Sequence, residues 1–215
     1  MPQKDLIVNE IFFSIQGEST YAGIPCVFVR LAHCDLRCSW CDTEYAFYEG
    51  TKMSVKEVLA ATRQYPCDLV EVTGGEPLLQ EGVHELIVSL LDAGRQVLIE
   101  TGGHRDISPV DPRAILILDV KCPDSGMSHK NRWENLEELK SKDEIKFVLA
   151  SRTDYDWAKN VIRRHDLASR HSVHFSPVWQ SLKPEQLAAW ILEDGLPVRL
   201  QLQLHKLLWG EQRGV

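Results

Sequence analysis

The sequence predicts an α/β protein with about six core strands in a parallel arrangement. The runs at 96–101, 115–120 and 144–150 are short and apolar, which is typical of strands buried on both faces. Segments with apolar residues at helical spacing alternate with such runs, and this alternation predicts βα units with right-handed crossovers. Polar or glycine-rich segments follow several strands, at the carboxyl ends where parallel βα folds place their chemistry.

Local signals predict the individual elements. Strands are expected at 6–14, 26–32, 68–73, 96–101, 115–120, 144–150, 172–175 and 198–205. Helices are expected at 54–64, 84–94, 153–165 and 183–194. Ser54 and Glu57 form a capping-box pattern at the start of the first helix. Gly94 closes the second helix, and Pro184 suits the first turn of the last one.

Length, charge and composition limit the classes of function. A chain of 215 residues without repeats or low-complexity linkers predicts one domain, residues 1–215. The net charge of −7 argues against a broad nucleic-acid interface, which needs clustered positive charge. No apolar stretch approaches the roughly 20 residues of a membrane span, and no signal-peptide pattern opens the sequence. We therefore expect a cytoplasmic protein without membrane or direct nucleic-acid partners.

Three cysteines lie close together, at Cys34, Cys38 and Cys41, in the pattern C-x3-C-x2-C. A structural zinc site normally has four ligands, and no second C-x-x-C pair exists in the sequence. A redox C-x-x-C pair would leave Cys34 without a role. Three thiolates suit a [4Fe–4S] cluster, because they leave one iron open to an exogenous ligand. The spacing favours the cluster, and a zinc-binding structural module stays as an alternative.

Two motifs together resemble the radical S-adenosylmethionine (SAM) enzymes. The cysteine loop has an aromatic residue, Trp40, before its last cysteine, and the glycine-rich segment 73–77 (TGGEP) ends a core strand. This resemblance implies a partial (β/α)6 TIM-like barrel, a [4Fe–4S] cluster and bound SAM. It implies SAM contacts at Ser39, Trp40, Gly74, Gly75, Glu76, Asp119, Val120, Lys121, Ser176 and Pro177.

Physical chemistry supports some of these SAM contacts. Gly74 and Gly75 lack Cβ atoms and so let the backbone approach a ligand closely. Lys121 follows an apolar run, where a lysine is unusual unless it reaches a carboxylate. Trp40 can pack near the adenine, although packing in the protein core would explain it as well.

Further motifs, in order along the chain, resemble one family of these enzymes. They are 12–19 (FFSIQGES), Arg30, the Cys41-Asp42-Thr43 triplet and 205–215 (HKLLWGEQRGV). The family is 7-carboxy-7-deazaguanine synthase, of the queuosine (7-deazapurine) pathway. Its reaction contracts the ring of 6-carboxy-5,6,7,8-tetrahydropterin, releases ammonia and regenerates SAM. The resemblance also implies Mg²⁺, a flavodoxin or ferredoxin as electron donor, and a homodimer.

The resemblance assigns roles to particular residues. Thr43 is the Mg²⁺ position, although Asp42 is the more natural ligand on charge alone, so the choice between them stays open. Arg30 offers a planar fork for the substrate carboxylate. Catalytic roles fall on Glu100 and Thr73. Substrate contacts are expected at Ile15, Gln16, Gly17, Glu18, Arg30, Thr73, Glu100, His205 and Val215.

A rival interpretation within the same superfamily is the activase of a glycyl-radical enzyme. Such an enzyme shares the cysteine pattern and a GGEP-like segment. It acts on a protein backbone, however, and needs neither the Gln16-Gly17-Glu18 motif nor Arg30.

Overall fold

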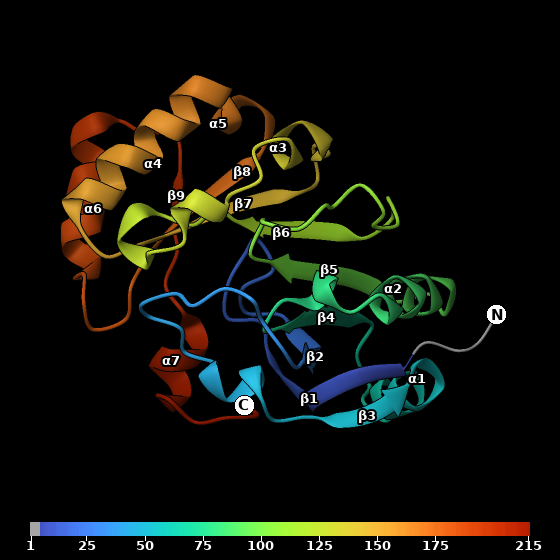
Figure 1. The fold of residues 1–215 in the computed structure, drawn as a ribbon. Helices are drawn as coiled ribbons and strands as arrows, with labels where there is room; N and C mark the ends of the chain where they lie inside the picture. Colours follow the sequence, from blue (N-terminus) through green and yellow to red (C-terminus); the bar gives the residue numbers. More distant parts are fainter. Residues whose placement is uncertain (1–4) are drawn as a thin grey trace.

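The computed structural model describes residues 5–215, whose strands form one nine-stranded sheet in the order β3-β1-β2-β4-β5-β6-β7-β8-β9 (Figure 1). The strands are β1 (Asp5–Ile15), β2 (Pro25–Leu31), β3 (Thr51–Ser54), β4 (Leu69–Gly74), β5 (Gln96–Thr101), β6 (Ile115–Asp119), β7 (Glu144–Leu149), β8 (Ser172–Pro177) and β9 (Arg199–Leu200). The helices are α1 (Val55–Thr62), α2 (Gly82–Asp92), α3 (Asn135–Glu138), α4 (Arg152–His165), α5 (Leu167–Arg170), α6 (Pro184–Asp194) and α7 (Leu204–Trp209).

The predicted parallel core is confirmed. Strands β2 and β4 to β8 run parallel to one another, and the two-residue β9 joins them in the same direction. Strand β1 instead pairs antiparallel with β2 and with β3, and β3 was not expected from the sequence. The sheet is therefore a parallel set of six full strands with an antiparallel extension at one edge.

Side chains on the core strands alternate between two environments. In β4, Val70 and Val72 join the main hydrophobic cluster, whereas Glu71 and Thr73 line a cavity on the opposite face. Strands β5, β6 and β7 repeat this two-residue period, because every second residue in a strand points to the same face. Polar residues thus reach the cavity without entering the apolar layer between sheet and helices.

The expected helix signals are confirmed. The Ser54 hydroxyl accepts from the backbone N–H of Glu57, and the Glu57 carboxylate accepts from the backbone N–H of Ser54 at 2.7 Å. Gly94 follows the end of α2 with φ +81°, and Pro184 occupies the first turn of α6. In the part of the chain that the structure describes, no helix is long and apolar enough to cross a membrane.

The expected final strand at 198–205 is wrong in extent. Only Arg199 and Leu200 pair with β8, and α7 begins at Leu204, so His205 lies on a helix. The backbone N–H of Gln201 still donates to the carbonyl of Phe175 on β8, but the polar groups that follow bond to the loop after β1. The backbone N–H of Leu204 donates to the carbonyl of Gly17 at 3.0 Å. In Figure 1 the chain leaves the sheet after β9 and runs to α7.

Candidate active site

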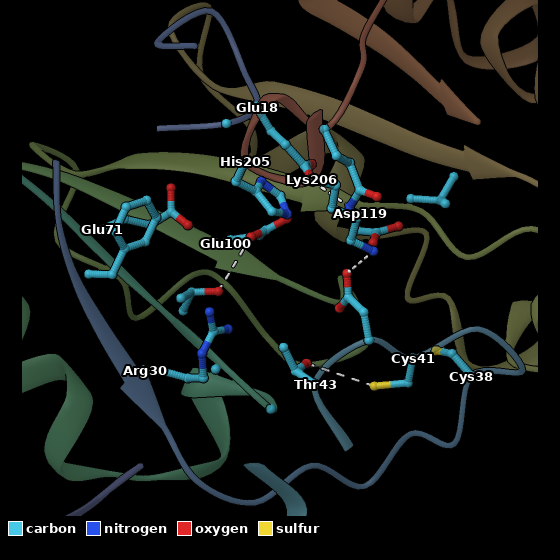
Figure 2. A pocket seen from close by; sticks show the side chains of 18 of the residues that line it. Glu18, Arg30, Cys38, Cys41, Thr43, Glu71, Glu100, Asp119, His205 and Lys206 are labelled. Atoms are coloured by element: carbon cyan, nitrogen blue, oxygen red, sulfur yellow. Dashed lines mark hydrogen bonds and ion pairs between the residues drawn. The ribbon is translucent and has the colours of Figure 1, made fainter. Parts of the chain in front are cut away.

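A cavity of about 690 Å³ lies at the carboxyl ends of the parallel strands. Its walls come from the loops after β1, β2, β4, β5 and β6, from the inner face of β7, and from α7 with the residues that follow it. Figure 2 shows carboxylates and basic groups pointing into this space at one end, and cysteines at the other. The arrangement brings together segments that are far apart in the sequence.

Most of the predicted site residues line this cavity. They are Ile15, Gln16, Gly17, Glu18, Arg30, Cys34, Cys38, Trp40, Cys41, Thr43, Thr73, Gly74, Gly75, Glu76, Glu100, Asp119, Lys121, His205 and Val215. Asp42, the alternative Mg²⁺ ligand, lines it as well.

Four predicted SAM contacts lie outside the cavity lining. Ser39 donates a hydrogen bond to the carbonyl of Asp124 at 3.1 Å, and Val120 belongs to the hydrophobic core. Ser176 and Pro177 end β8, where both side chains are buried. The Ser176 hydroxyl has no hydrogen-bond partner among residues 5–215. The SAM roles of these four residues stay predictions.

The cysteine loop presents three free thiols to the cavity. Cys34, Cys38 and Cys41 are each partly exposed and none is in a disulfide within the described chain. Burial raises the pKa of the Cys34 thiol to about 11 and also raises the pKa of Cys38. Thiolates therefore need a positive charge beside them, which the irons of a cluster supply. The donor set fits a cluster held by three cysteines.

A structural zinc site receives no support from this geometry. Within residues 5–215, no three Cys, His, Asp or Glu side chains are placed to hold one metal ion. A structural zinc site would need such a set, with four ligands around the ion.

The glycine-rich segment after β4 is packed tightly against the cysteine loop. The backbone N–H of Gly75 donates to the carbonyl of Leu31 at 3.0 Å, and that of Glu76 donates to the carbonyl of His33 at 2.8 Å. A Cβ atom on Gly75 would lie 2.2 Å from the carbonyl oxygen of His33, so no larger residue fits there. Glycine at this position sets the distance between the strand end and the cysteines.

Glu76 holds two strand ends together. Its carboxylate accepts hydrogen bonds from the Thr101 hydroxyl at 2.9 Å, from the backbone N–H of Gly102 at 2.8 Å and from that of Leu78 at 3.0 Å. Its side chain is almost fully buried. These bonds tie the loop after β4 to the end of β5, beside the predicted SAM position.

Lysine–carboxylate pairs neutralise most of the acidic groups in the cavity. Lys121 pairs with Asp119 at 2.7 Å, which leaves the other carboxylate oxygen of Asp119 buried without a hydrogen-bond partner in the described chain. That free acceptor and the ammonium of Lys121 suit the amino and carboxylate groups of SAM.

Asp42 and Thr43, the two candidate Mg²⁺ ligands, differ in the partners that their side chains already have. Asp42 pairs with Lys206 on α7 at 2.7 Å. Although burial opposes it, the ammonium of Lys206 lowers the pKa of Asp42. The Thr43 hydroxyl lies 3.8 Å from the sulfur of Cys41 and has no cation partner in the described chain. The charge of Asp42 is thus already compensated by a lysine, whereas the uncharged Thr43 hydroxyl has no such partner in the described chain.

The substrate end of the cavity contains Arg30 and His205. Arg30 bonds through Nε to Glu10 at 2.7 Å, and its guanidinium points into the cavity (Figure 2). Burial lowers the pKa of His205, which keeps the imidazole neutral at neutral pH. Arg30, a cation that can bind a carboxylate, and His205, a neutral ring that can donate and accept hydrogen bonds, thus face the same cavity.

Similarity to known proteins places the chain in a family. The model of the Radical SAM superfamily matches residues 29–121, from β2 through the cysteine loop to Lys121. Proteins called 7-carboxy-7-deazaguanine synthase from Koribacter versatilis and Chlorobaculum tepidum are each 47% identical to this chain. Those alignments cover 97% and 98% of this chain, and 99% and 97% of the two relatives. The chain belongs to the 7-carboxy-7-deazaguanine synthase family.

More distant relatives agree with this membership. A 7-carboxy-7-deazaguanine synthase from Thermoplasma acidophilum is 37% identical over 98% of this chain and 100% of its own length. The crystal structure of QueE from Escherichia coli superimposes with a TM-score of 0.77 at 22% identity, over 94% of this chain and 95% of that one. The fold is therefore the partial (β/α)6 barrel of the radical SAM enzymes. Membership of the synthase family replaces the activase and zinc-module alternatives.

Among the charged cavity residues on the core strands, Glu71 on β4 and Lys146 on β7 were not assigned to the site from the sequence. Each interrupts an apolar strand pattern, in DLVEVT and EIKFVLA. A charged residue beside or within an apolar run is also the signal at Lys121, and it applies equally to Glu71 and Lys146. Glu71 accepts a hydrogen bond from the side-chain amide of Gln16, and it has no cation partner among residues 5–215.

We expect Glu71→Gln to remove a pH-dependent loss of stability. Burial, with the neighbouring carboxylates of Glu100 and Glu18, raises the pKa of Glu71 well above its ordinary value. Folded protein therefore keeps a proton that the unfolded chain releases above pH ~4.3. The free energy of unfolding then falls with rising pH, by up to about 1.4 kcal/mol per pH unit, until the folded-state pKa is reached.

Urea denaturation of both proteins between about pH 5 and pH 8 measures this difference. Glutamine does not titrate, so the variant should gain stability relative to the native chain as the pH rises. A constant difference between the two proteins across this range would show that Glu71 is ionised in the folded state.

Proposed function

We propose that this member of the synthase family contracts the ring of 6-carboxy-5,6,7,8-tetrahydropterin to 7-carboxy-7-deazaguanine and releases ammonia. One observation carries the proposal at the level of residues. A single cavity joins three free thiols at one end to Arg30, Glu18 and Glu100 at the other. Such a cavity can hold SAM beside the thiols and a small anionic heterocycle beside the polar groups.

The cysteine end supports the cofactors that the radical SAM family implies. Cys34, Cys38 and Cys41 would hold the [4Fe–4S] cluster, with SAM between the Gly74-Gly75 backbone and the Asp119–Lys121 pair. When bound, these cofactors supply a radical that removes a hydrogen atom from the substrate. The protein's own contribution is to hold the substrate C–H bond in place and to exclude water.

The polar end suits a pterin with a carboxylate. The carboxylates of Glu18 and Glu100 accept hydrogen bonds from ring N–H groups, and the Gln16 amide can both donate and accept. Arg30 uses Nε for Glu10, and its terminal nitrogens remain for the substrate carboxylate. Thr73 donates to the Oε2 atom of Glu100 at 3.3 Å, which orients that carboxylate.

Mg²⁺ belongs to the proposal through Thr43. One hydroxyl, water molecules and substrate oxygens suit an ion that keeps most of its octahedral shell. The ion pair of Asp42 with Lys206 supports Thr43 over Asp42, because Asp42 already has a cation.

We expect Thr43→Ala to lower activity mainly by weakening the response to Mg²⁺. The concentration of Mg²⁺ for half-maximal turnover should rise about tenfold, the loss of one ligand worth about 1.4 kcal/mol. Turnover is measured across an Mg²⁺ titration, with Thr51→Ala on the outer strand β3 as a matched control. An unchanged Mg²⁺ response would move the ion elsewhere, with Asp42 as the next candidate.

An electron donor, an oligomeric state and a cellular location also belong to the proposal. A flavodoxin or ferredoxin would supply the electron, and the chain would act as a homodimer, as the family resemblance implies. A cytoplasmic location suits free cysteines that hold an iron–sulfur cluster, because thiols stay reduced there.

The function is tested by anaerobic turnover of reconstituted protein with the carboxytetrahydropterin, SAM and a reductant, with and without Mg²⁺. We expect the 7-deazaguanine product, one ammonia per product, and no net consumption of SAM. Protein that cleaves SAM but forms no ring-contracted product would contradict this function. Protein that binds no iron would contradict the cofactor assignment as well.

A further inference from the structure

Lys146 is a buried lysine in the cavity wall. It lies on β7, its side chain is 7% exposed, and its ammonium pairs with Glu100 at 2.8 Å and with Glu18. Lysine is among the residues least often buried, and burying its charge is unfavourable unless a partner compensates. Hydrophobic packing therefore does not explain why a lysine occupies this position.

The two carboxylates come from different parts of the barrel. Glu100 ends β5, and Glu18 lies in the loop after β1. Each also has a protein partner on its far side: Thr73 donates to Glu100 at 3.3 Å, and Gln203 donates to Glu18 at 2.8 Å. Lys146 thus forms ion pairs with both carboxylates and links the loop after β1 to the end of β5.

The electrostatics require this cation. Glu18 and Glu100 are partly buried and share one cation, and without that cation repulsion and desolvation would favour proton binding by one carboxylate. Although burial opposes it, the Lys146 ammonium lowers the pKa of Glu100. Burial likewise opposes the charge on Lys146, and the carboxylates of Glu100 and Glu18 hold its pKa well above the ordinary value.

No other cation replaces Lys146 in the described part of the chain. The charged groups that face the trio are Arg30 from β2, Asp42 from the cysteine loop, Glu71 from β4, Asp119 from β6, Lys121 after β6, and His205 and Lys206 from α7. Lys121 is paired with Asp119, Lys206 with Asp42, and Arg30 with Glu10. The remaining basic group, His205, is held neutral by burial, which lowers its pKa.

We propose that Lys146 is a positioning residue, whose ion pairs with Glu18 and Glu100 aim both carboxylates together at the N–H edge of the substrate. An ionised carboxylate only accepts hydrogen bonds, whereas a protonated one also donates. Loss of the cation would turn one acceptor into a donor and place it against the N–H groups of the pterin. The inference rests on the proposed function, because it assumes a substrate rich in N–H donors.

The test is Lys146→Met, compared with Lys146→Arg and with a matched control. Lys159→Met is that control, because Lys159 also bridges two carboxylates, Asp156 at 3.3 Å and Asp194 at 2.9 Å, but on the outer helices. We expect Lys146→Met to raise KM for the carboxytetrahydropterin about 30-fold, equal to about 2 kcal/mol at 1.4 kcal/mol per tenfold. Lys146→Arg should recover most of that loss, and Lys159→Met should keep KM at the native value.

Two further readouts separate positioning from general damage. Calorimetric binding of the carboxytetrahydropterin, without turnover, should weaken by the same factor in Lys146→Met, while SAM cleavage without substrate persists. The KM of this variant should also fall as the pH rises from about 7 to about 9, because the protonated carboxylate then ionises. Wild-type protein should lack that pH dependence of KM.

A double variant keeps the inference falsifiable if the single one folds poorly. Lys146→Met combined with Glu18→Gln removes one of the two carboxylates that the missing cation compensated, so this variant should be more stable than Lys146→Met, while its KM stays above that of Glu18→Gln alone. A native KM in Lys146→Met, or a pH-independent loss in kcat alone, would overturn the inference. Absence of ring contraction by the wild-type protein would instead contradict the proposed function.

Discussion

Alanine in place of Cys34, Cys38 or Cys41 is expected to abolish reductive cleavage of SAM. Each thiolate would hold one iron, and a cluster with two protein ligands is not retained in a stable form. The three thiols lie on the wall of the same cavity, and none has a disulfide partner within residues 5–215 that could compensate. Cleavage is measured as 5′-deoxyadenosine formed under anaerobic conditions, together with iron content and the visible absorption of the cluster.

Cys67→Ala is the matched control for this series. Cys67 is also a free, partly exposed cysteine, but it lies before β4 and outside the cavity lining, with its thiol near the carbonyl of Pro25. We expect full cluster content and full SAM cleavage in this variant. Retained cleavage in any of the three cluster variants would contradict the ligand assignment.

Gly75→Ala is expected to have the second largest effect, on stability and on the cluster together. The new methyl group would lie 2.2 Å from the carbonyl oxygen of His33 and 2.9 Å from the Cβ atom of Cys34. Since the first of these is backbone, the cysteine loop has to move away from the strand end. Overpacking of this kind costs about 1–3 kcal/mol or more, and the displaced cysteines should lower iron content severalfold. Urea denaturation and iron analysis measure the two effects.

Gly94→Ala separates steric from conformational cost. Gly94 has φ +81°, and a Cβ atom added there would meet no neighbouring atom of the described chain within 4 Å, so alanine is strained only by its backbone angle. That strain costs about 1 kcal/mol, and iron content should stay native. Equal iron loss in both variants would show that general destabilisation, and not the contact with His33, empties the cluster site.

The parallel core could be predicted because its strands carry their own signal. The strand at 115–120 begins with four consecutive apolar residues, Ile115 to Leu118, which is typical of a strand covered on both faces. The end of the sheet could not be predicted in this way. The alternation in 198–205 satisfies a strand pattern, but its polar groups bond to the loop at Gly17 and Glu18, and such a long-range partner leaves no local trace.

In the candidate site, too, local motifs could be predicted and long-range pairs could not. The cysteines and the Gly74-Gly75 pair could be recognised because each forms a short local motif in the sequence, and both motifs line the cavity. Lys146 could be noticed as a charge in an apolar strand, but not paired, because Glu18 and Glu100 reach it from other parts of the barrel. The ion pair between Asp42 and Lys206 was hidden for the same reason.

The hydrogen bonds between the loop after β1 and the segment before α7 determine when, during synthesis, this part of the cavity can form. Gln201 donates to the carbonyl of Ser19, and the two residues are 182 positions apart in the chain. A ribosome adds about 5–20 residues per second, so roughly 10 to 40 seconds separate the arrival of the two partners. During that interval the βα units can assemble one after another. The substrate end of the cavity, in contrast, is completed only when its late partner has left the ribosome.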